Sequence, residues 1–132
     1  MEVLLVEPGK EARIAEIGSD LKSLQAAVGG YIEAAYFFDD PVALICNEEG
    51  KVYGLPYNRA VRDEAGKVQD IIAGPFFVCG LGEDDFCSLP KELQGKYLDM
   101  FRHAEKFTAI GGKLVITQDK PRAAPARQEA ER

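Results

Sequence analysis

The sequence contains one histidine, three widely separated cysteines and no long apolar run. A membrane-spanning helix needs about 20 consecutive apolar residues, so a protein of that kind is excluded. No Cys-x-x-Cys pair or Cys/His cluster is present, which argues against structural zinc. The simplest expectation for Cys46, Cys79 and Cys87 is that they are buried free thiols.

An excess of basic residues is also lacking, since the net charge is −6 at pH 7. Binding to nucleic-acid phosphates needs a basic face, so no nucleic-acid partner is expected. A DNA mimic would also be acidic, but Lys and Arg are interspersed along the chain, whereas mimicry needs a densely anionic surface. Residues 1–7 are too short and too acidic for a signal peptide, and we therefore expect a cytoplasmic protein.

The length of 132 residues provides for one domain with one core. Short apolar or alternating segments separated by turn residues predict antiparallel strands, and two amphipathic segments predict helices. We predict an α+β fold with a mainly antiparallel sheet of about five strands, covered on one face by both helices. The expected strands lie in residues 3–6 and 12–17, which should pair as a hairpin, in 31–38 and 42–46, which should form a second hairpin, and in 68–81 and 113–117. The Gly74-Pro75 pair predicts a bulge or bend within 68–81.

Capping residues predict where the helices begin and end. Ser19 is the expected N-cap of the first helix, and Gly29 the left-handed residue that ends it. Ser88 is the expected cap of the second helix, with Pro90 in its first turn. From residue 118 onward the chain has no apolar anchor, so we predict a domain over 1–117 and a disordered tail over 118–132.

A polar, turn-rich stretch over residues 47–59 lies between the apolar runs 41–46 and 71–81. Loops mounted on rigid strands often carry binding sites. The planar guanidinium of Arg59 can bind a carboxylate or phosphate through two hydrogen bonds, and asparagine amides can donate to and accept from the polar groups of a ligand. If the two hairpins are neighbours, Glu33, Tyr31 and Tyr53 line the same cavity as these side chains. The candidate ligand-binding residues are Asn47, Glu48, Asn58, Arg59, Asp70 and Glu33.

Two alternatives to a binding site remain open for this stretch. It can be an ordinary hairpin turn in which Asn58 and Arg59 satisfy backbone groups. Glu48 or Asp70 can serve as a general acid or base, although abundant carboxylates are weak evidence for catalysis. No nucleophile lies beside an activating base, and neither a calcium loop nor a phosphate-binding glycine loop is present. We therefore expect no catalytic residue, no metal and no cofactor.

Six segments of the chain form a distinctive combination: LLVEPGK (4–10), LQAAVGGYIE (24–33), NEEG (47–50), GLPYNR (54–59), DIIAG (70–74) and FF (76–77). Together they resemble an uncharacterised domain family of phages, plasmids and conjugative elements, mainly of Gram-positive gut bacteria. The resemblance covers roughly residues 1–107. It implies that the protein is an accessory protein of a mobile element, as members of the family look to be, but it implies no particular reaction.

Two functions follow as hypotheses. The first is a non-enzymatic accessory protein that binds a small polar or anionic ligand, such as a nucleotide-like molecule, around Asn58 and Arg59. The alternative is a protein-binding module that inhibits or recruits a host protein through a sheet edge or its acidic face. Self-association into a homodimer through an edge strand is compatible with either.

Overall fold

The computed structural model describes residues 1–119. The predicted domain boundary at residue 117 falls inside its last strand, which continues to Asp119. Residues 120–132, which hold most of the predicted tail, lie outside the described residues.

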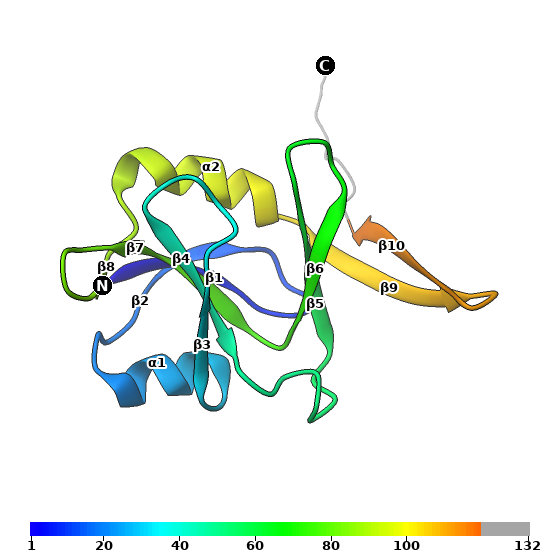
Figure 1. Ribbon diagram of the computed structural model, residues 1–132, viewed down its shortest axis with the longest axis horizontal. Coiled ribbons are helices and arrows are strands. Elements are labelled where there is room, and N and C mark those ends of the chain that lie inside the picture. The colour runs from blue at the N-terminus through cyan, green and yellow to red at the C-terminus, as the bar shows by residue number, and fades with distance from the viewer. Residues whose placement is uncertain (120–132) are drawn as a thin grey trace, which may run out of the picture.

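A central antiparallel sheet organises the fold, as predicted (Figure 1). Five strands follow in the order β2-β1-β7-β4-β3, and the short β8 extends the sheet by pairing with the end of β7. The expected hairpins, β1 with β2 and β3 with β4, are confirmed. The strands are β1 (Glu2–Val6), β2 (Arg13–Glu16), β3 (Ile32–Ala35), β4 (Val42–Asn47), β7 (Phe76–Leu81) and β8 (Phe86–Cys87).

The two helices pack on opposite faces of this sheet, so the prediction that they share one face is wrong (Figure 1). Helix α1 (Leu21–Val28) covers the face that carries Ile45 and Phe77. Helix α2 (Lys91–Phe101) covers the face that carries Leu44 and Phe76. Every residue of β4 is buried, and a strand buried on both faces needs cover on both sides.

The helix ends correct the sequence prediction in part. Gly29 ends α1 with φ of 80°, as expected, but the N-cap is Asp20, whose carboxylate accepts from the Ser23 amide at 3.2 Å. Pro90 occupies the N-cap position of α2 and provides no side-chain cap. The Ser88 hydroxyl instead accepts from the Glu2 amide at 2.9 Å, which ties the entry to α2 onto β1.

Two two-stranded ribbons complete the described fold. One pairs β5 (Tyr57–Arg62) with β6 (Val68–Ala73), and a bend at Gly74, with φ of 82°, leads into β7 as predicted. The other pairs β9 (Ala104–Ile110) with β10 (Lys113–Asp119) and projects from the body (Figure 1). The polar loop expected over residues 47–59 is therefore shorter, because its last three residues belong to β5.

Candidate functional site

Asn58 lies inside the protein with no exposed surface. Its Nδ2 donates to the Val6 carbonyl at 3.0 Å and to the Gly74 carbonyl at 2.9 Å. Its Oδ1 accepts from Arg59 at 2.9 Å. The amide thus connects β1, β5 and the bend before β7, and both of its functional atoms are used within the chain.

Arg59 is only 1% exposed and is the largest fully buried side chain of the described residues. Its Nε donates to the Phe101 carbonyl at 3.0 Å, and Nη2 donates to the Lys10 carbonyl at 2.6 Å. Its Nη1 donates to the carbonyl and the side chain of Asn58. The expectation that Asn58 and Arg59 face an open concavity is wrong, since their donors bind neighbouring backbone.

Three of the other predicted residues, Glu33, Glu48 and Asp70, do come together. They line a shallow hollow of about 120 Å³ on β3, β4 and β6. Lys51 Nζ lies 2.8 Å from Asp70 Oδ1, which also accepts from the Ile71 amide at 2.8 Å. Cys46 lies beside them, and burial raises the pKa of its thiol to about 11. The thiol is neutral at physiological pH, so this group offers carboxylates without a nucleophile.

Asn47 faces away from this group, because successive residues of a strand point to opposite sides. It lines a hollow of about 270 Å³ together with Tyr31 and Tyr53, as the sequence suggested, but Glu33 is not among the lining residues. The sequence did not single out Glu49 and Gln25, which complete this hollow with Gly29 and Gly30. The six predicted residues are thus divided among three places.

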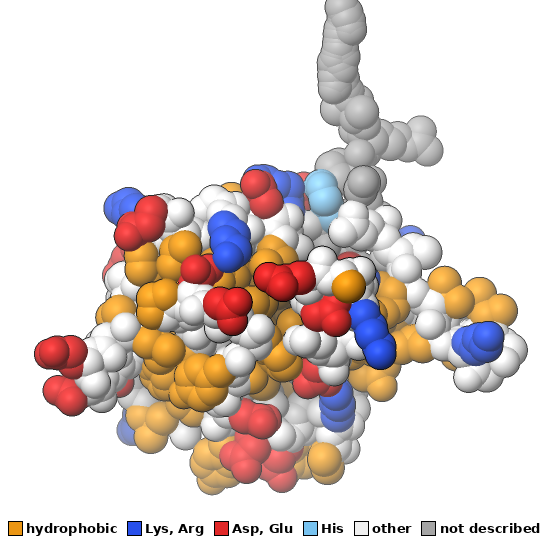
Figure 2. Space-filling model, turned by 45° about the horizontal axis from the view of Figure 1, so that its top comes forward, with side chains coloured by type: hydrophobic (Ala, Val, Ile, Leu, Met, Phe, Trp, Pro, Cys, Tyr) orange, Lys and Arg blue, Asp and Glu red, His pale blue; other side chains and the backbone are white. Residues whose placement is uncertain are grey.

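A third hollow, of about 410 Å³, lies between α2, the segment after β3 and the β5–β6 hairpin. Acidic and basic side chains both lie on the face shown in Figure 2, scattered among hydrophobic ones. The two cations that line this hollow are already paired, Lys96 with Asp40 at 2.7 Å and Arg62 with Glu105 at 2.9 Å. The hollow therefore offers no unpaired cation to an anionic ligand.

Asp40 joins the turn after β3 to α2, because its Oδ2 accepts from Lys96 at 2.7 Å and from Tyr97 at 2.6 Å. These hydrogen bonds lower the pKa of Asp40 below its ordinary value. The stabilisation is therefore complete above the unfolded-state pKa and is lost as pH falls through the lower folded-state pKa.

We expect Asp40→Asn to lower the melting temperature at neutral pH, and the difference from the parent protein to shrink on acidification. Thermal unfolding measured across that pH range checks this prediction. Asp39→Asn is the matched control, since the Asp39 side chain makes no hydrogen bond or ion pair with the described residues. A melting difference that stays constant down to acid pH would show that the carboxylate charge is not what stabilises the turn.

A metal site and a membrane-spanning helix can both be looked for among the described residues. In residues 1–119 no group of three His, Cys, Asp or Glu side chains is placed to hold a metal ion. No helix in this part of the chain is long and apolar enough to cross a membrane.

Residues 1–102 match a known family, and the chain belongs to it: the family described as a domain of unknown function, DUF3846. The matched segment contains the central sheet and both helices, and it ends before the β9–β10 ribbon. No curated protein and no solved structure matched the chain.

Proposed function

We propose that this protein is a non-enzymatic binding protein that acts by binding another protein through its β9–β10 ribbon. The side-chain donors of Asn58 and Arg59 bind backbone carbonyls of the protein itself. This favours protein binding over the binding of a small anionic ligand by these two residues. The observation that carries the proposal is an apolar ribbon that projects from the body and is only partly covered (Figure 1).

Cross-strand register divides the ribbon into two faces. Glu105 points toward β5, where its carboxylate accepts from the Ala60 amide at 2.7 Å. Phe107 and Leu114 lie on the same face as Glu105, because alternate residues and directly paired residues share a side. At the base, Phe107 packs edge-on against Tyr57, with ring centroids 5.5 Å apart. Leu114, nearer the tip, is 42% exposed.

The ribbon therefore continues an apolar surface beyond the part of the body that covers it. Ile110 and Val115 are also exposed near its tip but lie on the opposite face of the ribbon, and Figure 2 shows hydrophobic side chains gathered on this projection. An isolated two-stranded ribbon is marginally stable in water, so contact with a partner would stabilise it. Within residues 1–119, β10 pairs only with β9, and its outer edge is suited to strand addition.

The setting that we propose is the cytoplasm of a cell that carries a mobile genetic element, with the protein acting as an accessory factor of that element on a host protein. The resemblance of the segments quoted above supports this setting.

We expect a photoreactive amino acid at position 114 to give a discrete covalent adduct with a host protein after irradiation in host cells. The same group at position 52 is the control, since Val52 is 80% exposed but belongs to the segment between β4 and β5 and lines the hollow around Asp70. Mass spectrometry identifies the adduct. An adduct of twice the chain mass would assign the ribbon to a homodimer, and equal labelling at both positions would contradict a specific surface.

A further inference from the structure

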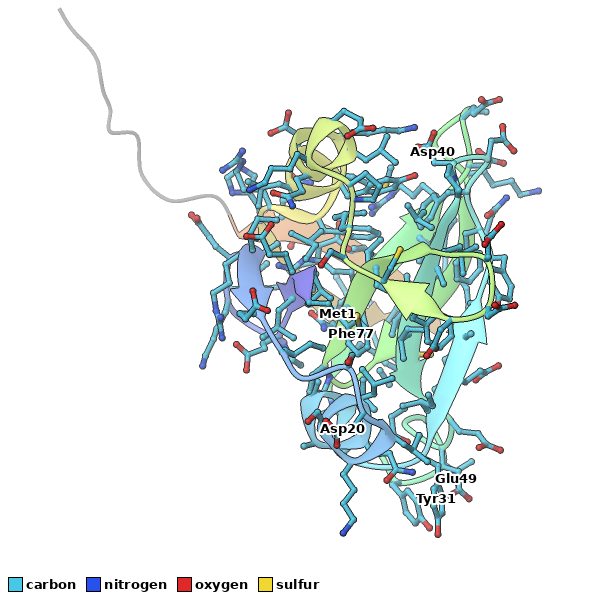
Figure 3. All side chains as sticks on the ribbon, turned by 90° about the vertical axis from the view of Figure 1, so that its left-hand side faces the viewer. Met1, Asp20, Tyr31, Asp40, Glu49 and Phe77 are labelled. Atoms are coloured by element: carbon cyan, nitrogen blue, oxygen red, sulfur yellow. The ribbon has the colours of Figure 1, made fainter. Side chains whose placement is uncertain are left out.

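We propose that the hollow at the C-terminal end of α1 binds an organic cation, an ammonium or guanidinium head group. This inference does not depend on the ribbon or its partner. The hollow is formed where the end of α1, the start of β3 and the turn after β4 meet. Tyr31 and Glu49 lie next to each other beside α1 in Figure 3.

Hydrogen bonds fix the backbone frame of this hollow. Asn47 donates from Nδ2 to the Val28 carbonyl at 3.2 Å and accepts at Oδ1 from the Glu49 amide at 2.8 Å. The Glu48 amide donates to the Tyr31 carbonyl at 2.8 Å. A Cβ atom at Gly30 would lie 2.8 Å from Asn47 Nδ2, so a larger residue there would displace the Asn47 amide from its hydrogen bonds. The site is therefore preorganised.

The electrostatics of the hollow favour a positive ligand. Its lining residues include no Lys, Arg or His. The half-buried Glu49 carboxylate makes no ion pair or hydrogen bond with any residue of the described chain. Helix α1 ends here without a basic residue in its last turn, so the negative end of its dipole has no compensating charge within the helix.

Two tyrosines supply the other half of the recognition chemistry. Tyr31 is 69% exposed and Tyr53 is 70% exposed, and both line the hollow. An aromatic face attracts a cation with about 0.5–1 kcal/mol at an exposed site and with more when water is excluded. A hard metal ion prefers several oxygen ligands instead, whereas aromatic rings with one carboxylate suit an alkylated or planar organic cation.

The proposal is tested by NMR titration of the full chain with tetramethylammonium chloride, at constant ionic strength maintained with sodium chloride. We expect saturable shifts of the amide signals of Gly29, Gly30 and Glu49. Glu49→Gln and Tyr31→Leu should each weaken the binding about two- to fivefold. Glu48→Gln and Tyr36→Leu should leave it unchanged, because Glu48 lines a different hollow and Tyr36, although 63% exposed, does not line this one.

A second titration with N-acetyl-lysine methylamide distinguishes the source of the cation. Tighter binding of the lysine derivative indicates a side chain of a partner protein, and tighter binding of tetramethylammonium indicates a free quaternary amine. If neither compound shifts these amide signals saturably, or if the two control variants lose binding as strongly as Glu49→Gln, the proposal is overturned. Melting temperatures of all four variants show that each is folded.

Discussion

Replacing Arg59 with alanine is expected to destabilise the protein by about 3–6 kcal/mol, because the change orphans buried carbonyls and leaves a cavity. The Phe101 and Lys10 carbonyls, which lose their donors, belong to the end of α2 and to the β1–β2 turn. A domain of this size is stable by only about 5–15 kcal/mol in total. We therefore expect Arg59→Ala to be largely unfolded near physiological temperature.

Urea unfolding monitored by circular dichroism measures this loss. Arg13→Ala is the matched control, since Arg13 is 56% exposed and pairs with Glu7 on the surface, where ion pairs contribute at most about 1 kcal/mol. Arg59→Lys should lie between the two, because an ammonium group does not reproduce the spread of guanidinium donors. If Arg59→Ala unfolds at the same urea concentration as the parent protein, the guanidinium is not structural and a ligand role returns.

The prediction that Asn58 and Arg59 lie in an open site was wrong for a specific physical reason. Polar residues beside Pro56 and Gly54 indicate an exposed loop, since such side chains are seldom fully buried. The partners that make their burial possible are distant in sequence, 42 residues from Arg59 in the case of Phe101 and 52 from Asn58 in the case of Val6. Sequence patterns report local structure, so these long-range acceptors could not be predicted.

Local features of the fold were predicted because their causes are local. The Gly29 helix end and the bend at Gly74 depend on backbone conformations that glycine adopts easily. The arrangement of the helices was missed although a signal was present. Continuous apolar runs over residues 42–46 and 76–79, without alternation, are typical of strands covered on both faces.

Only part of the candidate site was predicted correctly. Glu33, Glu48 and Asp70 do gather, because β3 and β4 are hairpin neighbours and the turn after β4 returns to β6. Asn47 was assigned to the same group, but strand alternation sends it to the opposite side. Gln25 contributes to that second hollow only because α1 ends beside the β4 turn, a tertiary contact that the sequence pattern does not encode.

The two phenylalanines that begin β7 provide the strongest test of the two-sided core. Phe76 packs edge-on against Phe101 of α2, with ring centroids 5.2 Å apart, whereas Phe77 belongs to the cluster beneath α1. Both are fully buried, so Phe76→Ala and Phe77→Ala should each cost about 3–5 kcal/mol. Leu81→Ala, at the 36% exposed end of the same strand, should cost much less.

Hydrogen exchange distinguishes the two substitutions by location. Phe76→Ala should accelerate exchange mainly in α2, and Phe77→Ala mainly in α1, because each cavity opens beneath a different helix. The measurement is made under conditions in which both variants remain mostly folded, so that local opening is observed and not global unfolding. Equal acceleration in both helices for each variant would mean that the two clusters open as one unit, despite the sheet that separates them.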